Sequence, residues 1–158
     1  MVIFFTCNHC PYVIGSDGYT ESLAKKYQKK GVQFIGINSN SATIVPEDDF
    51  NGMINRMGQN EFSWVYLRDE TQETALSYGA QKTPHFFVFD KKRDLLYHGA
   101  AIDNPKSPND STKHYLDEVL HQATSNEKPL QRTYQPIGCT IKWKPENVTQ
   151  AESCDVVF

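Results

Sequence analysis

The 158-residue chain has few cysteines, no long apolar run and little excess charge, and each shortage excludes a class of protein. Four cysteines are too few for a small secreted scaffold held together by disulfides. No apolar stretch approaches the roughly 18 residues that span a bilayer. A net charge of −3 gives no electrostatic reason to expect a nucleic acid or an anionic membrane as partner. The composition is typical of one soluble globular domain.

The first residues carry no recognisable targeting signal. The opening MVIFF is too short for the core of a signal peptide, and it lacks a basic flank and a small-residue cleavage site. Because the chain can begin inside a longer gene product, the location stays open, with the cytoplasm favoured.

Apolar runs and amphipathic stretches alternate over residues 1–124, which we interpret as one α/β domain with a mixed central sheet flanked by helices. Strands are expected at 2–5, 32–38, 64–69, 85–90 and 95–99. Helices are expected at 11–30, 46–58 and 71–79, with a last one capped by Ser111 or Thr112. Gly15 and Gly18 predict a kink or a frayed segment in the first helix. Residues 125–158, punctuated by prolines, are expected to form an extended C-terminal tail.

Two of the four cysteines, Cys7 and Cys10, enclose His9 in the stretch TCNHCPYV, and Pro11 suits the first turn of a helix. The N-terminus of a helix favours a thiolate and lowers a thiol pKa from about 8.5 to between about 3.5 and 7.5. We expect Cys7 to be the exposed nucleophile and Cys10 the thiol that closes the disulfide. His9 adds a dipole, or a positive charge when protonated, beside the thiolate; this would stabilise the reduced form and make the pair more oxidising than a thioredoxin near about −270 mV.

A second motif, QKTPHFFVFD, places Thr83 and Pro84 directly before a strand. A cis Thr83–Pro84 bond would leave a backbone edge free to pair with an incoming extended peptide. An ordinary trans proline at the start of a strand fits the same pattern, so the pattern leaves both isomers open.

Five stretches together resemble the thioredoxin-like redoxins of the alkyl hydroperoxide reductase/thiol-specific antioxidant superfamily, in its bacterial thioredoxin-family or peroxiredoxin-like branch. They are FFTCNHCPYV, GVQFIGINSN, PEDDF, LRDETQETALSYGAQKTPHFFVFD and GCTIKWK, within residues 2–144. The resemblance implies a thioredoxin-like fold with an extra helix after the second strand, a Cys7–Cys10 redox pair and a cis Pro84 facing it. Thr83, Pro84 and His85 are then the expected substrate-binding residues.

The chain also departs from this family. Members usually carry a β-hairpin before the FTCNHC strand, and we expect the domain at 1–124 to lack it. Members often have charged residues after the later hairpin, where this chain reads GAAIDNP and offers only Asp103. Cys154 lies beyond the resemblance and is expected to be an incidental thiol.

The function that these features favour is thiol–disulfide exchange through Cys7 and Cys10, with no cofactor and no bound metal. The expected partner is a protein or small-molecule thiol or disulfide, and a homodimer is left open. A thiol-dependent peroxidase is the first alternative, although neither cysteine is preceded by the Pro-x-x-x-Thr/Ser-x-x-Cys pattern of peroxidatic sites. The second alternative is a copper or zinc carrier that uses Cys7, Cys10 and His85.

The third cysteine, Cys139, lies in the stretch PIGCTIKW after the last expected helix. It could serve as a third redox cysteine that resolves Cys7. The favoured interpretation is a small buried residue that anchors the tail.

Overall fold

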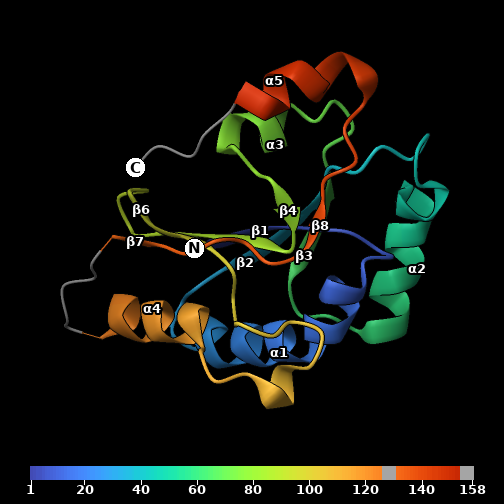
Figure 1. Cartoon of the computed structure of the whole chain (residues 1–158). Helices are drawn as coiled ribbons and strands as arrows, with labels where there is room; N and C mark the ends of the chain where they lie inside the picture. Colours follow the sequence, from blue (N-terminus) through green and yellow to red (C-terminus); the bar gives the residue numbers. More distant parts are fainter. Residues whose placement is uncertain (126–130, 154–158) are drawn as a thin grey trace.

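A mixed six-stranded sheet forms the centre of the computed structural model, which describes residues 1–125 and 131–153 (Figure 1). The strands lie in the order β3-β2-β1-β5-β6-β7. Their bounds are β1 Val2–Thr6, β2 Phe34–Asn38, β3 Val65–Arg68, β5 His85–Phe89, β6 Leu95–Gly99 and β7 Arg132–Thr133. Cys154 lies outside the described residues. No helix within the described ranges is both long enough and apolar enough to cross a membrane.

Strand β1 lies in the middle of this sheet, because its five residues are apolar or small and all five are buried. It pairs in parallel with β2 and antiparallel with β5. Its side chains alternate between the two faces: Val2 and Phe4 join one apolar cluster, and Ile3 and Phe5 join another. A central strand buried on both faces is typical of layered α/β proteins.

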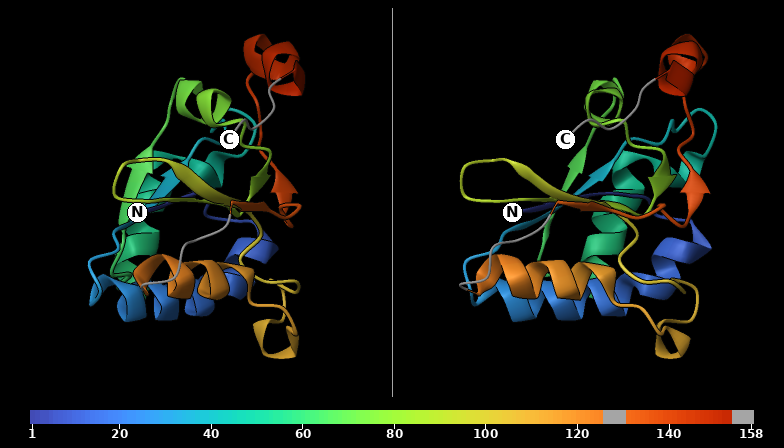
Figure 2. Two further views of the ribbon diagram at one scale, coloured as in Figure 1. Left: turned by 90° about the vertical axis from the view of Figure 1, so that its left-hand side faces the viewer. Right: turned by 60° about the vertical axis from the view of Figure 1, so that its left-hand side comes forward.

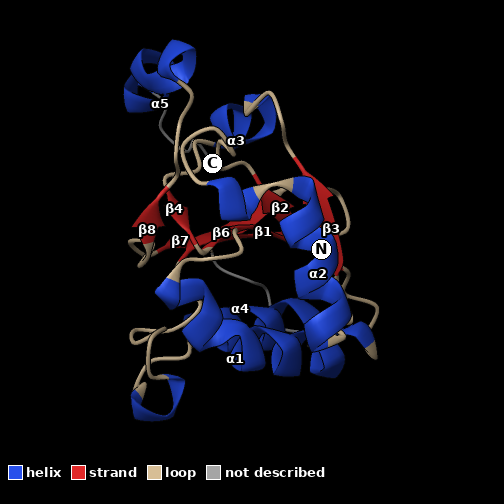
Figure 3. Ribbon diagram, turned by 90° about the vertical axis from the view of Figure 1, so that its right-hand side faces the viewer, coloured by secondary structure: helices blue, strands red, loops and turns tan. Residues whose placement is uncertain are grey.

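Helices cover both faces of the sheet. Figure 2 shows α1 (Pro11–Gln28) and α4 (Tyr115–Thr124) side by side on one face, with α3 (Glu73–Tyr78) and α5 (Val148–Ser153) on the other. The view in Figure 3 shows the same layers, with α2 (Phe50–Asn60) at the side of the sheet. The inserted helix expected after the second strand is therefore α2.

Helix α1 is continuous from Pro11 to Gln28, so the frayed segment expected near its two glycines as one of two possibilities is not found. Gly15 is required for packing: a Cβ there would lie 2.7 Å from the carbonyl oxygen of Pro105 and 2.9 Å from Lys106 Cα. The Oγ of Ser16 donates to the carbonyl of Tyr12 one turn earlier, at 2.8 Å. The glycine thus permits a loop to approach the helix closely.

Two helix starts differ from the expectation. The segment expected as one helix at 46–58 is a 3₁₀ turn, η1 (Pro46–Asp48), followed by α2, which begins after Asp49. The carboxylate of Asp49 accepts the backbone N–H of Gly52 at 2.6 Å and so caps α2. This break leaves Asp48 outside α2, where it can turn toward the cysteines.

Helix α4 is preceded by His114 rather than by Ser111 or Thr112. The carboxylate of Asp103 accepts the backbone N–H and the hydroxyl of Thr112, at 3.0 and 2.8 Å, and this holds the chain in a loop before the helix begins. Asp103, the charged residue considered for substrate contact, therefore has a structural partner in its own loop.

The C-terminal segment packs against the rest of the molecule through a second, two-stranded sheet. Strand β8 (Cys139–Thr140) pairs antiparallel with β4 (Lys82–Thr83), and the turn η3 (Pro145–Asn147) leads into α5. Ile141, which comes directly after β8, is 2% exposed and belongs to the apolar cluster of Ile3 and Phe5. The segment is thus anchored by a buried side chain as well as by its strand.

The two glycines of α1 give a matched test of this packing. Replacing Gly15 by Ala is expected to lower the free energy of unfolding by roughly 1–3 kcal/mol, because the new methyl group overlaps the backbone of residues 105 and 106. Replacing Gly18 by Ala is expected to raise it by up to about 1 kcal/mol, since alanine favours the helix and nothing lies within 4 Å of the new Cβ. Urea unfolding of both variants measures the difference; equal stabilisation would contradict the close approach.

Candidate active site

Three thiols meet beside the end of β1 and the start of α1. Cys7 and Cys10 are both 0% exposed, and with Val13 they form a small buried cluster against which Cys139 packs. Cys10 Sγ lies 2.7 Å from Cys139 Sγ, although 129 positions separate these residues in the chain. All three are free thiols. The structure therefore brings a third cysteine to the pair that the sequence motif indicated.

Cys10, not Cys7, stands at the N-terminus of α1. Cys10 is the N-cap residue, with extended backbone angles (φ −65°, ψ 126°), and Pro11 is the first residue of the helix. Cys7 lies three positions earlier, immediately after β1 ends at Thr6. Cys7 thus lies at the junction between strand and helix, as expected, but the expectation that it is the more exposed of the two is wrong, because both cysteines are fully buried.

The surroundings of the two thiols also shift their pKa values in opposite directions. A hydrogen bond from the Cys7 thiol is the largest influence that lowers the pKa of Cys10, and the Cys139 thiol and the backbone N–H of Val13 add to it against the effect of burial. The same hydrogen bond to Cys10, together with burial and the negative charge of Asp48, raises the pKa of Cys7. Within this pair, these influences favour ionisation of Cys10 and oppose ionisation of Cys7.

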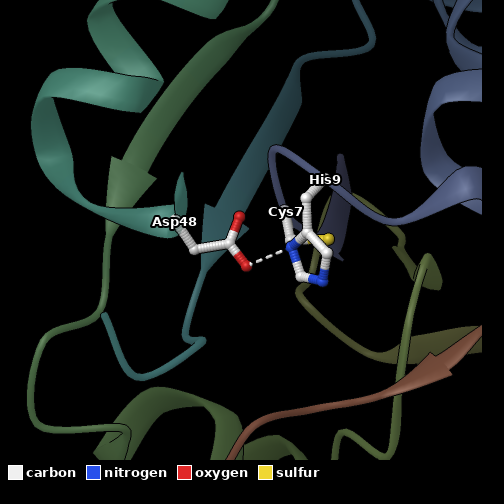
Figure 4. A group of neighbouring side chains, drawn as sticks. All are labelled: Cys7, His9 and Asp48. Carbon is white, nitrogen blue, oxygen red and sulfur yellow. Dashed lines mark ion pairs between the residues drawn. The ribbon is translucent and has the colours of Figure 1, made fainter. Parts of the chain in front are cut away.

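His9 is paired with a buried carboxylate that was not among the expected site residues. His9 Nδ1 lies 2.7 Å from Asp48 Oδ2, and the side chain of Asp48 is fully buried while that of His9 is 31% exposed (Figure 4). Asp48 also accepts the backbone N–H of Asn8 at 2.6 Å and the Nδ2 of Asn40 at 2.7 Å. These donors compensate the buried charge.

This arrangement adds a partner to the role expected for His9. The imidazole lies beside the Asp48 carboxylate, so any positive charge on it would act on the thiols together with a negative charge. The net effect of Asp48 on Cys7 is to oppose its ionisation. The signal for Asp48 was present in PEDDF, but three consecutive acids before an apolar stripe indicated only a helix start.

The Thr83–Pro84 peptide bond is cis, as the resemblance implied, and Thr83 contacts both thiols of the motif. Its Oγ1 lies 3.4 Å from Cys7 Sγ, and its carbonyl oxygen lies 3.3 Å from Cys10 Sγ. Thr83 is itself buried, with 1% of its surface exposed. Thr83 thus lies against both sulfur atoms, with its hydroxyl beside Cys7 and its backbone carbonyl beside Cys10.

The backbone edge beside Pro84, which was expected to be free for an incoming peptide, is occupied by the chain itself. Cys139 pairs with Thr83 across the β4–β8 ladder, and the N–H of Ile141 donates to the carbonyl of Gln81 at 3.3 Å. Gly138 crosses so closely that a Cβ there would lie 2.1 Å from the carbonyl oxygen of Thr83. The tail occupies this edge because a glycine and a short strand allow the two backbones to meet.

His85 is buried, with 1% of its surface exposed. Its ring packs against those of Phe87 and His98, with centroids 4.4 and 5.7 Å away. Its Nδ1 accepts the backbone N–H of Gln81 at 3.3 Å, and burial lowers its pKa to about 3. His85 therefore remains neutral over the physiological pH range.

The metal-carrier alternative required His85 together with Cys7 and Cys10. Among the described residues, the metal-capable group is instead Cys7, His9 and Asp48, whose ligand atoms lie within 4.8 Å of one another. The carboxylate of this group already accepts hydrogen bonds from Asn8 and Asn40. The set needed for the metal carrier is thus not the set that the fold assembles.

Comparisons with known proteins agree on the fold. A sequence model of the family described as Redoxin matches residues 1–120. A conserved protein from Geobacillus kaustophilus, described as uncharacterised, is 37% identical over 91% of this chain and 77% of its own, with a TM-score of 0.83. A hypothetical protein from Sinorhizobium meliloti 1021 is 28% identical over 91% of this chain and 79% of its own, with a TM-score of 0.82.

A more distant match is a candidate thioredoxin from Neisseria meningitidis, 18% identical over 61% of each chain, with a TM-score of 0.54. At that identity the likeness concerns the fold alone. A search of curated proteins gave no match. The thioredoxin-like fold expected from the sequence is therefore confirmed.

The assignment of the thiolate can be tested by following its ultraviolet absorbance against pH. One cysteine of the reduced protein is expected to ionise well below the ordinary thiol pKa of about 8.5, because the neighbouring thiols and the N–H of Val13 stabilise the Cys10 anion. The low transition should disappear in Cys10→Ser and persist in Cys7→Ser, whose hydroxyl can still donate. The reverse pattern would return the nucleophile to Cys7.

Proposed function

The chain belongs to the redoxin family, and from that membership and the three thiols beside α1 we propose that it is a thiol–disulfide oxidoreductase working through its Cys7-x-x-Cys10 pair. An oxidoreductase role in general follows from the family. The reacting residues, the kind of exchange and the substrate are the proposal. The observation that carries it is the position of Cys10 as the N-cap of α1, with a second thiol as its hydrogen-bond donor.

In the proposed reaction the Cys10 thiolate attacks one sulfur of a substrate disulfide. A bond forms between Cys10 and that sulfur, the substrate S–S bond breaks, and the other substrate sulfur leaves as a thiolate that takes up a proton. A second protein thiol then attacks Cys10 Sγ and releases the remaining substrate thiol. The protein finishes with a Cys7–Cys10 disulfide, and the substrate has gained two electrons; the reverse sequence oxidises a dithiol.

The contacts of the site support this chemistry step by step. Cys7 keeps its proton while Cys10 is anionic, because the hydrogen bond to Cys10 and the nearby Asp48 charge disfavour a second thiolate. When Cys10 forms a mixed disulfide, it loses its negative charge. The hydrogen bond to the Cys10 thiolate then no longer opposes ionisation of Cys7. The two thiols can therefore act in sequence.

The proposed substrates are disulfides of proteins or small molecules. Peroxide is the less favoured oxidant, because the sequence before Cys10 has Cys7 where a peroxidatic site has threonine or serine. Thr83 and Pro84 remain the proposed residues for positioning the substrate sulfur, since the Thr83 backbone lies against Cys10.

Reduction of insulin disulfides with dithiothreitol as electron donor tests the proposal. The wild-type protein is expected to accelerate reduction, and Cys10→Ser to return the rate to that of dithiothreitol alone, because it removes the attacking thiolate. Cys154→Ser is the matched cysteine control and is expected to leave the rate unchanged. Hydrogen peroxide consumption is measured in parallel, and peroxide turnover that depends on Cys10 and exceeds disulfide reduction would overturn the proposal.

A further inference from the structure

The C-terminal segment places a thiol and a strand at the point where a substrate would have to bind. We propose that Cys139 is the resolving cysteine of the reaction: it attacks the mixed disulfide on Cys10 as β8 returns to the edge of β4, and the disulfide is then passed to Cys7. This inference rests on the proposed function. It begins from the 2.7 Å between Cys10 Sγ and Cys139 Sγ and from the pairing of Cys139 with Thr83.

The position of Cys139 is set on its N-terminal side by Gly138. A side chain at 138 would overlap the carbonyl oxygen of Thr83 and approach the nitrogen of Pro84. Glycine is therefore the residue that lets β8 approach the cis peptide closely enough for the sulfur atoms to meet. A thiol brought only into the general vicinity would not need so tight a crossing.

On the C-terminal side, Lys142 holds the segment through its backbone. Its N–H donates to Asn40 Oδ1, and its carbonyl accepts from Gln72 Nε2, both at 2.9 Å. The carbonyl also accepts the backbone N–H of Ser41 at 2.9 Å. With Ile141 buried beside them, these bonds fix the segment three residues from the sulfur. A thiol tethered this closely to its target gains rate by proximity when its strand returns.

An extended substrate and β8 compete for one strand edge. In the structure Cys10 is fully buried and β8 pairs with Thr83, so a substrate must displace β8 before its disulfide reaches Cys10. The return of β8 then has two effects: it removes the substrate backbone from Thr83 and it delivers the Cys139 thiol to the mixed disulfide. Release of the substrate backbone and delivery of Cys139 to the mixed disulfide then occur in one movement of β8.

The bonds balance without an outside reagent. The Cys139 thiolate attacks Cys10 Sγ, the Cys10–substrate bond breaks, and the substrate thiolate leaves and is protonated, so that a Cys10–Cys139 disulfide remains. The Cys7 thiolate next attacks Cys10 Sγ, and Cys139 leaves as a thiol. The final state is the Cys7–Cys10 disulfide of the proposed function.

The electrostatics of Cys139 fit this order. Burial and the hydrogen bond to the Cys10 thiolate raise the pKa of Cys139 to about 11, while Lys142 and Lys106 act in the opposite direction. Burial, the largest of these effects, remains when Cys10 is bound to substrate, but both contributions of Cys10 are then gone, and ionisation of Cys139 is less strongly opposed. Cys139 is also partly exposed, whereas Cys7 is fully buried, so the thiol nearer the surface reacts first.

The test uses the reduced full-length protein with oxidised glutathione as the disulfide, followed by acid quenching and mass spectrometry. The wild type is expected to show an intramolecular disulfide and little glutathione adduct. Cys139→Ser is expected to accumulate the adduct on Cys10, with a lifetime at least about tenfold longer, because the positioned thiol is lost. Cys7→Ser is expected to give a Cys10–Cys139 disulfide in the peptide map.

A second pair of variants separates the movement from the thiol. Gly138→Ala keeps Cys139 but pushes β8 away from Thr83, and it is expected to lengthen the adduct lifetime in the same direction. Gly58→Ala, where nothing lies within 4 Å of the new Cβ, is the matched control and is expected to match the wild type.

The outcomes distinguish the two proposals. An adduct in Cys139→Ser that resolves as fast as in the wild type, or the absence of a Cys10–Cys139 disulfide in Cys7→Ser, would overturn the role of Cys139 and leave the exchange through Cys7 and Cys10 standing. A wild-type protein that forms neither an adduct on Cys10 nor an intramolecular disulfide would overturn the proposed function and this inference together.

Discussion

The antiparallel pairing of Thr83 with Cys139 is the contact on which the arrangement of the site depends. It covers the strand edge next to the cis proline, buries Cys10 and brings the third thiol to the start of α1. A backbone ladder of two residues is a small interaction by itself. The residues after β8 hold it in place, because Ile141 is buried in the core and Lys142 is bonded on both its N–H and its carbonyl. The two-residue strand β8 thus closes the site, and the contacts of Ile141 and Lys142 hold it there.

Asp48 imposes the second constraint. A buried carboxylate is tolerated only with several polar partners; here Asn8 and Asn40 donate hydrogen bonds, and the His9 imidazole lies beside it, from two different loops. The bonds fix the loop between β1 and α1 against η1, and with it the spacing of Cys7 and Cys10. The same charge opposes ionisation of Cys7. Asp48 therefore holds the loop in place, and its charge adds to the effects of the Cys10 hydrogen bond and of burial, which raise the pKa of Cys7.

Local patterns predicted the fold well, because its strands and helices are determined by residues close together in sequence. The all-apolar run at 2–5 predicted a buried strand, and the family motifs implied the inserted helix, now α2. The helix start was also predictable in detail: Pro11 at the first helical position implies that Cys10 is the N-cap, yet the motif was interpreted from its first cysteine. Ser111 failed as a cap because Asp103, eight residues away, holds the following backbone in a loop.

The part of the site that could not be predicted depends on long-range contacts. Nothing near GCTIKWK indicates that Gly138 will cross Thr83, because the reason lies more than fifty residues earlier in the chain. The burial of Asp48 likewise follows from Asn8 and Asn40, whose positions are set by separate strands. Sequence patterns report periodicity and local capping, whereas a charge or thiol is assigned to a site by the tertiary packing of several segments.

These contacts also change the physical basis expected for the redox poise. Anything that stabilises the thiolate of a dithiol stabilises the reduced form and makes the couple more oxidising. The sequence assigned that effect to a dipole or charge on His9, but in the structure any such charge is matched by Asp48. The stabilising groups are instead the thiols of Cys7 and Cys139 and the N–H of Val13. Forming a disulfide with Cys10 consumes one of those thiol donors, so oxidation removes both the anion and part of its support. In the exchange proposed above, the reduced form is therefore stabilised by the same sulfur atoms that react.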